Sequence, residues 1–247
     1  MSFDAHPRSS LIVALDFDSL TAAVKFAKQV ADLVGMFKIG SQLFTSAGPE
    51  AVRQVAQLGA GIFLDLKFHD IPNTVAGAVL ASAAMPGVQL VNVHAIGGSA
   101  MMRAAAQAVS AGVPMGADRT RLLAVTILTS MDQKAIHEVG IGGAPKVRVV
   151  KLAQLAKKAG VDGVVASVQE AKAIRKGCGQ EFLIVTPGVR PKDKTMSAKN
   201  DDQARTATPR EAIKAGADFI VVGRPIIAAS DPRAAAQEIV DEIAAAK

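Results

Sequence analysis

Residues 62–74 read IFLDLKFHDIPNT, and this stretch contains the junction between one strand and one helix. Ile62–Leu66 is apolar apart from Asp65, as expected for a strand that is buried on both faces of a parallel sheet. Asp70-Ile71-Pro72 then places an N-cap residue type just ahead of a proline, which is typical of a helix start. The stretch therefore predicts a buried strand followed directly by a helix.

The same unit recurs along the chain. Short apolar runs alternate with longer segments whose apolar residues lie three and four positions apart, the period of a helix that covers a sheet. The other expected strands are Leu11–Leu15, Met36–Ile39, Leu90–Val93, Leu122–Ile127, Gly163–Ala166, Phe182–Val185 and Phe219–Val222. The expected helices include Thr21–Leu33, Pro49–Leu58, Ser99–Ser110, Lys146–Ala159 and one that follows Ser230-Asp231-Pro232.

Eight strand–helix units in 247 residues predict an α/β fold, a single-domain (β/α)8 TIM barrel, which typically takes about 250 residues. No GxGxxG motif opens the first unit, which disfavours an open, doubly wound sheet. No linker or shift in composition divides the chain, so residues 1–247 are expected to form one domain.

Composition excludes several classes of protein. The net charge is +6, but the basic residues are scattered, aromatic residues make up 4% and Trp and Tyr are absent, so we expect no nucleic-acid partner. No apolar run approaches the ~18 residues of a membrane span. The first ten residues are polar, and Cys178 is the only cysteine, so we expect a cytoplasmic protein without disulfides.

Charged residues stand at the predicted strand ends, where barrel active sites lie. They are Asp16 after the first strand, Lys38 in the second, and Asp65 and Lys67 in the third. Asp65 and Lys67 are two positions apart, so their side chains should leave the same face of the strand. Buried charges are costly unless paired, and an alternating array can stabilise charge in a transition state. The alternative is a purely structural ion-pair network.

Other polar residues allow simpler interpretations. Asp70 fits a helix N-cap as well as a catalytic group. His69 and His94 are more simply explained as packing residues near a site than as catalysts. The four histidines and one cysteine are dispersed, so we expect no metal site.

A phosphate site is indicated after the seventh and eighth strands. Gly188 and Arg190 follow the former, and Gly223 and Arg224 follow the latter. Barrels often bind phosphate with these two loops, because glycine lets the backbone approach and arginine gives a bidentate charged contact. Residues 191–204, which are polar and lack large hydrophobic side chains, are expected to form a mobile lid on the phosphate.

Together these motifs resemble the orotidine 5'-monophosphate decarboxylase family, in particular its shorter bacterial branch. The matching stretches run from residue 11 to about residue 226 and are ALD (14–16), FKIG (37–40), DLKFHDIPNT (65–74), VHA (93–95), LTS (128–130), TPGVR (186–190) and IVVGRP (220–225). The resemblance implies a lyase that converts orotidine 5'-monophosphate to UMP and CO2 without a cofactor, as the last step of de novo pyrimidine biosynthesis.

The resemblance also implies a role for each site residue. Lys67 would protonate C6 of the pyrimidine, and Asp65 would face the departing carboxylate in a charge array with Lys38. Asp70, Ile71 and Thr74 would reach into the site of the neighbouring subunit, which makes a homodimer the active unit. Asp16 and Lys38 would contact the ribose, Thr129 or Ser130 the pyrimidine, and Arg190, Gln203, Gly223 and Arg224 the phosphate.

Three other functions remain open at this point. A related barrel could be a Mg²⁺-dependent sugar-phosphate decarboxylase or aldolase, which EDTA would inhibit. A Schiff-base aldolase would need a neutral Lys67, whereas nearby carboxylates favour its charged form. A non-catalytic nucleotide-binding barrel would bind UMP without turnover, and it would be expected to lack some of the four charges.

Overall fold

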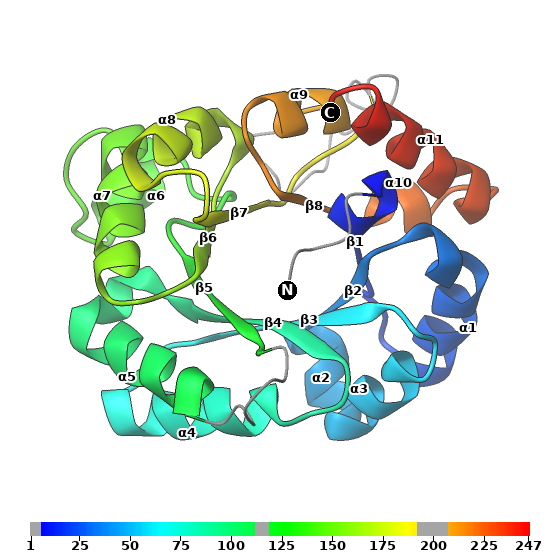
Figure 1. The fold of residues 1–247 in the computed structure, drawn as a ribbon, viewed down its shortest axis with the longest axis horizontal. Coiled ribbons are helices and arrows are strands. Elements are labelled where there is room, and N and C mark those ends of the chain that lie inside the picture. Colours follow the sequence, from blue (N-terminus) through cyan, green and yellow to red (C-terminus); the bar gives the residue numbers. More distant parts are fainter. Residues whose placement is uncertain (1–5, 112–118, 192–206) are drawn as a thin grey trace.

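The computed structural model describes residues 6–111, 119–191 and 207–247. Eight parallel strands form a closed barrel, in which each strand pairs with the next and β8 pairs back with β1 (Figure 1). The strands are β1 (Leu11–Ala14), β2 (Met36–Gly40), β3 (Gly61–Phe68), β4 (Val88–His94), β5 (Arg121–Val125), β6 (Gly163–Val165), β7 (Leu183–Thr186) and β8 (Phe219–Val222).

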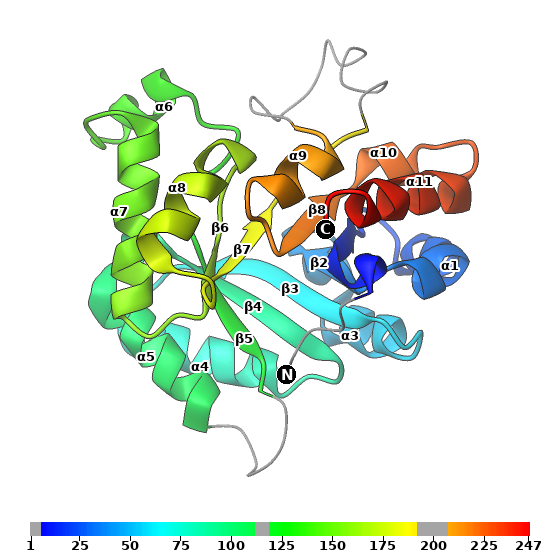
Figure 2. The same cartoon turned by 45° about the horizontal axis from the view of Figure 1, so that its top comes forward.

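Helices surround the barrel on its outside (Figures 1 and 2). The α-helices are α1 (Leu20–Val30), α2 (Ser41–Ala47), α3 (Pro49–Ala56), α4 (Pro72–Ala83), α5 (Gly98–Ala111), α6 (Gln133–Glu138), α7 (Pro145–Lys158), α8 (Val168–Cys178), α9 (Pro209–Lys214), α10 (Arg224–Ile227) and α11 (Pro232–Ala244). Three 3-10 helices are η1 (Pro7–Ser10), η2 (Ala31–Leu33) and η3 (Ala95–Gly97). No helix within the described residues is long and apolar enough to cross a membrane.

The predicted (β/α)8 barrel is confirmed, and every expected strand is present. The expected cap of the last helix is also confirmed, since the Asp231 side chain accepts a hydrogen bond from the Ala234 backbone N–H at 3.0 Å. Two short helices, α2 and α6, lie outside the predicted pattern. The strand β3 runs on to Phe68, beyond the predicted end at Leu66.

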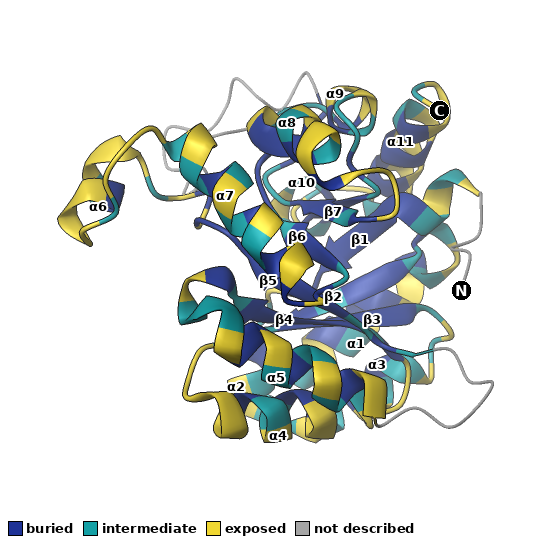
Figure 3. Ribbon diagram, turned by 60° about the vertical axis from the view of Figure 1, so that its left-hand side comes forward, coloured by how far each residue is buried: buried dark blue, intermediate teal, exposed yellow. Residues whose placement is uncertain are grey.

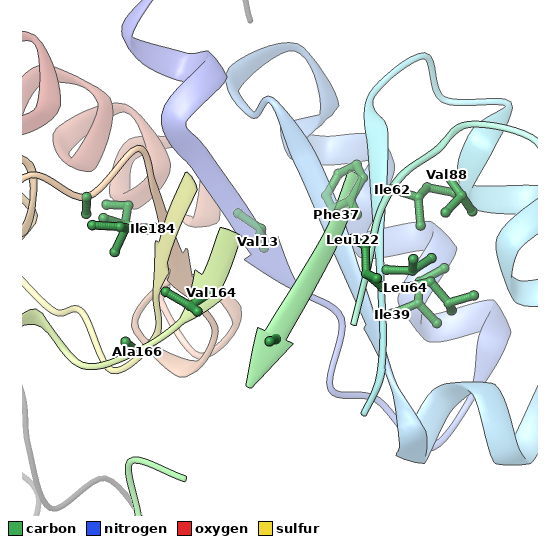
Figure 4. Close-up of a cluster of buried hydrophobic side chains, with 14 of the residues drawn as sticks. Val13, Phe37, Ile39, Ile62, Leu64, Val88, Leu122, Val164, Ala166 and Ile184 are labelled. Atoms are coloured by element: carbon green, nitrogen blue, oxygen red, sulfur yellow. The ribbon is translucent and has the colours of Figure 1, made fainter. Parts of the chain in front are cut away.

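The core has two apolar layers. One lies between the strands and the surrounding helices, and it includes Val13, Phe37, Leu64 and Ile184 (Figure 4). The other fills the barrel interior and includes Met36, Phe63 and Leu90. In Figure 3 the strands are buried while the outer faces of the helices are exposed. Because alternate residues of each strand serve the two layers, the interior layer fixes which side chains can reach the mouth of the barrel.

Polar side chains continue the interior layer toward the carboxyl ends of the strands. Lys38 follows Met36 by two positions, Asp65 follows Phe63, and Asn92 follows Leu90. Since side chains two apart on a strand share a face, these three point into the barrel above its apolar layer.

Candidate active site

A cavity of about 290 Å³ opens at this end of the barrel. This volume lies near the lower end of the range for small-molecule sites, roughly 300–1,000 Å³. The predicted residues that line it are Asp16, Lys38, Asp65, Lys67, Thr129, Ser130, Gly188, Arg190, Gly223 and Arg224. Side chains from both halves of the sequence therefore converge on one cavity.

Four charges form an unbroken alternating chain along one wall of the cavity. The Lys38 ammonium lies 3.1 Å from a carboxylate oxygen of Asp16 and 3.5 Å from Asp65 Oδ2. The Lys67 ammonium lies 2.7 Å from Asp65 Oδ1. Asp65, which is 7% exposed, is thus held between two ammonium groups, and this pairing offsets the cost of burying its charge.

Electrostatics keep Lys38 charged. Burial alone would lower the pKa of its ammonium, but the carboxylates of Asp65 and Asp16 outweigh burial, so the pKa is raised above its ordinary value of 10.5. Gly40 leaves room for this group, because a Cβ at residue 40 would lie only 2.9 Å from Lys38 Nζ. Lys38 is therefore a fixed positive charge between two carboxylates.

The β3 strand departs from regular geometry where the array sits. Leu64 is paired with Val91 and Phe68 with Val93, so Asp65, Leu66 and Lys67 lie opposite the single residue between them on β4. Lys67 has a φ of 53° and is the only non-glycine residue with positive φ in the part of the chain that the structure describes. The prediction that Asp65 and Lys67 share a face assumed a regular strand. They do meet, but through a bulge that re-aims Lys67.

Asn92 is the residue opposite the bulge, and it is a site residue that was not predicted from the sequence. Its side chain is fully buried, its Oδ1 accepts the Lys67 backbone N–H at 2.8 Å, and its Nδ2 donates to Asp65 Oδ1 at 2.6 Å. The sequence does contain a sign of this role, because Asn92 is the one amide within the otherwise apolar run of residues 90–93. A buried polar group inside a strand requires a partner, which points to a site.

The two histidines lie beside the array. The rings of His69 and His94 are 5.7 Å apart between centroids. Burial lowers the pKa of His94, and the neighbouring His69 and Lys67 lower it further, although Asp65 opposes this. Neither histidine is among the described residues that line the cavity. Across the described part of the chain, no three His, Cys, Asp or Glu side chains lie together as a metal-binding group.

The part of the cavity lining that follows β7 and β8 is positively charged. Arg190 follows β7 and Arg224 follows β8, and burial together with the nearby Arg224 charge lowers the pKa of Arg190. The φ of Gly188 is 75°, a conformation that favours glycine. Two guanidinium groups that repel each other are well placed to share one anion.

Gln203 and nearly all of the expected lid, residues 191–204, lie outside the described residues. The residues that flank this segment lie close together, since the Arg190 backbone N–H donates to the Ala207 carbonyl at 2.9 Å.

The loop that follows β3 does not contribute the predicted residues to this cavity. Asp70, Ile71 and Thr74 are exposed and do not line the cavity among the described residues. The alternative of Asp70 as a helix N-cap is wrong: Ile71 holds the N-cap position of α4, without a side-chain cap, and the Asp70 carboxylate accepts the Ile71 backbone N–H at 2.6 Å. The extra residue between Asp70 and the helix start takes the carboxylate out of capping reach.

Comparisons with known proteins agree with this geometry. A sequence model of the "Orotidine 5'-phosphate decarboxylase / HUMPS family" matches residues 9–239. Orotidine 5'-phosphate decarboxylases of Trichlorobacter lovleyi and Geotalea uraniireducens are 54% and 52% identical over 238 residues, 96% of each chain. The crystal structure of orotidine 5'-phosphate decarboxylase from Lactobacillus acidophilus superimposes with a TM-score of 0.81 at 40% identity, covering 94% of this chain and 98% of that one. This chain belongs to the orotidine 5'-phosphate decarboxylase / HUMPS family.

Proposed function

We propose that this protein decarboxylates orotidine 5'-monophosphate to UMP and CO2, the last step of de novo UMP biosynthesis. The observation that carries the proposal is the Asp16–Lys38–Asp65–Lys67 array, which shares one cavity with the Arg190–Arg224 pair. The family name has two parts, and relatives at 50–54% identity, among them those from Geotalea uraniireducens and Trichlorobacter lovleyi, bear the decarboxylase name. A chain with one cysteine suits the reducing cytoplasm, where we place the reaction.

The chemistry needs a fixed positive charge next to C6. When the bond from C6 to the carboxylate breaks, its electron pair stays on C6 in the plane of the ring, where the π system cannot delocalise it. Lys67 would stabilise this carbanion and donate a proton to C6, and solvent would then return the proton to the lysine. Such preorganised charge is most effective in a site that excludes water. The array would thus serve without a cofactor.

Asp65 would fix the direction of the Lys67 ammonium, and Lys38 would in turn fix Asp65. Asp65 Oδ1 is 2.7 Å from Lys67 Nζ, and Lys38 compensates the second carboxylate oxygen. A single ammonium cannot supply a barrier reduction of up to ~23 kcal/mol, the scale of very proficient enzymes. Binding energy from parts of the substrate remote from C6 would contribute by holding the pyrimidine against the array.

The remaining cavity residues would bind the nucleotide. Gly188, Arg190, Gly223 and Arg224 would hold the phosphate, with Gln203 as a further contact from the lid, residues 191–204. Asp16 and Lys38 would contact the ribose hydroxyls. Thr129, which is 8% exposed, and its neighbour Ser130 would contact the pyrimidine.

We also propose a homodimer with shared sites. The support is the exposed loop after β3, because Asp70, Ile71 and Thr74 follow the catalytic strand yet lie outside its own cavity. Ile71 is 66% exposed, and Ile96 on η3 and Leu80 on α4 are 49% and 43% exposed. Apolar side chains of this size are unfavourable in water and favour burial against a partner. A two-fold dimer would deliver Asp70, Ile71 and Thr74 to the neighbouring cavity.

Turnover of orotidine 5'-monophosphate by purified protein, followed by ultraviolet absorbance in the presence of EDTA, tests the activity. We expect orotidylate absorbance to fall as UMP forms. Turnover that appears only when Mg²⁺ is restored, and with a sugar phosphate instead, would favour the related Mg²⁺-dependent barrels. Binding of UMP by folded protein without turnover would favour a nucleotide-binding protein.

A further inference from the structure

Asn92 lies opposite the longer of the two irregularities in the β3–β4 ladder, the one between Leu64 and Phe68. Three residues of β3 lie opposite it, so the regular backbone hydrogen bonds of a parallel pair cannot form there. Its side chain is fully buried and replaces them, since Oδ1 accepts from the Lys67 backbone N–H at 2.8 Å. Without this acceptor, a buried N–H would be left without its bond.

The same amide also reaches the catalytic carboxylate. Asn92 Nδ2 donates to Asp65 Oδ1 at 2.6 Å, and that oxygen is the one that contacts Lys67 Nζ at 2.7 Å. The orientation of the amide is fixed by chemistry, because a backbone N–H needs an acceptor and a carboxylate needs a donor. One planar group therefore holds the backbone of residue 67 and the carboxylate of residue 65 in a single arrangement.

A left-handed backbone is unfavourable for a residue that carries a Cβ, and it persists only where its surroundings impose it. Lys67, with a φ of 53°, is such a residue. Leucine at position 92 would satisfy neither partner, and aspartate would place a second carboxylate against Asp65. An amide is the group of this size that satisfies both at once.

We propose that Asn92 is a positioning residue, which fixes the directions of the Asp65 carboxylate and the Lys67 ammonium. The inference rests on the proposed decarboxylation, in which Lys67 is the proton donor. Asn92 acts through these two residues and is not among the described residues that line the cavity. Its loss should therefore impair the chemical step and leave nucleotide binding, which we assign to Arg190 and Arg224, largely unchanged.

The test compares Asn92→Leu with Thr126→Val. The control also removes a hydrogen bond of a buried side chain, from Thr126 Oγ1 to the Val165 carbonyl at 3.1 Å, and this bond runs to β6 and not to the array. For Asn92→Leu we expect kcat to fall about 10²-fold, the effect of a misplacement of roughly 1 Å, while KM changes less than about 3-fold. A kcat within about 3-fold of the wild type, or a loss matched by the control, would overturn the proposal.

A second variant, Asn92→Asp, guards against misfolding of the first. The new carboxyl group would face Asp65 and Lys67 of β3, Lys38 of β2 and His94 of its own strand. When protonated, it is isosteric with the amide and can again donate to Asp65. We expect its kcat, relative to wild type, to recover as the pH is lowered from 8 to 5.5, whereas that of Asn92→Leu should not. A ratio that stays constant would overturn the hydrogen-bond assignment.

Failure of the proposed function would be recognised separately. If the wild-type protein does not turn over orotidine 5'-monophosphate, the decarboxylation proposal fails by itself. A crystal structure of Asn92→Leu would still test the positioning role. We expect residue 67 to leave the left-handed region in this variant, and an unchanged φ would contradict the inference.

Discussion

Replacing Arg224 with alanine tests whether phosphate binding and the chemical step are carried out by different residues of the cavity. Arg224 lines the same cavity as the charge array and lies close enough to Arg190 to lower the pKa of that guanidinium. A charge-assisted hydrogen bond contributes about 1.5–3 kcal/mol, so two bonds to phosphate contribute about 3 kcal/mol at the lower limit. Since each 1.36 kcal/mol is tenfold, we expect kcat/KM to fall roughly 10²-fold. Most of the loss should appear in KM, because the phosphate does not react.

The Arg190–Arg224 repulsion adds a second expectation. A bound phosphate neutralises both groups, so part of its binding energy is the relief of this repulsion. Either single variant already removes the repulsion. We therefore expect the losses of Arg190→Ala and Arg224→Ala, expressed as free energies, to sum to more than the loss of the double variant.

Steady-state kinetics with orotidine 5'-monophosphate and with orotidine, which lacks the phosphate, would measure these effects. Arg233→Ala is a matched control, because Arg233 pairs with Asp32 at 2.7 Å on the outside of the barrel and should change kcat/KM less than about 2-fold. An Arg224→Ala effect of equal size on orotidine, or an unchanged KM for the nucleotide, would refute the assignment of Arg224 to the phosphate.

Three further predictions concern the array and the dimer. Lys67→Ala should lower kcat by about 10⁴-fold, as expected for loss of a general acid, while UMP still binds in calorimetry; substantial residual turnover would contradict its role. Mixing inactive Lys67→Ala and Asp70→Ala proteins should restore about a quarter of wild-type activity, because half the exchanged dimers would carry one intact site; proven exchange without recovery would exclude shared sites. Lys38→Met should lower the free energy of unfolding by about 3 kcal/mol at pH 7. Because the folded-state pKa of Lys38 lies above 10.5, this difference should persist up to about that pH and shrink as the pH rises further, which urea denaturation at several pH values would reveal.

The strands and the position of the cavity could be predicted from the sequence because their signals are local. Each strand is a continuous apolar run, and a charge at the end of such a run can be read directly. Asp16, Lys38 and Asp65 therefore appear where the sequence placed them.

The features that the sequence did not predict depend on pairing between distant residues. The bulge at Lys67 arises from the register between β3 and β4, which no window of sequence contains. Asn92 was visible as an isolated amide, but its two partners lie 25 and 27 positions away. For Asp70, the choice between a helix N-cap and a catalytic group depended on where α4 starts, and sequence patterns do not define a helix start to within one residue.

The pairing of β1 with β8 has a consequence for how the protein is made. Leu11 and Val13 pair with Ile220 and Val222 on β8, which is synthesised after the other seven strands of the barrel. Arg224 follows directly, and a Cβ at Gly223 would lie 3.6 Å from Asp16, so the first and last strands together complete the rim of the cavity. A chain that leaves the ribosome early would therefore lack both the closing strand and a phosphate arginine. Catalysis would then begin only after β8 and Arg224 have been synthesised, and recovery of activity would report on barrel closure during refolding.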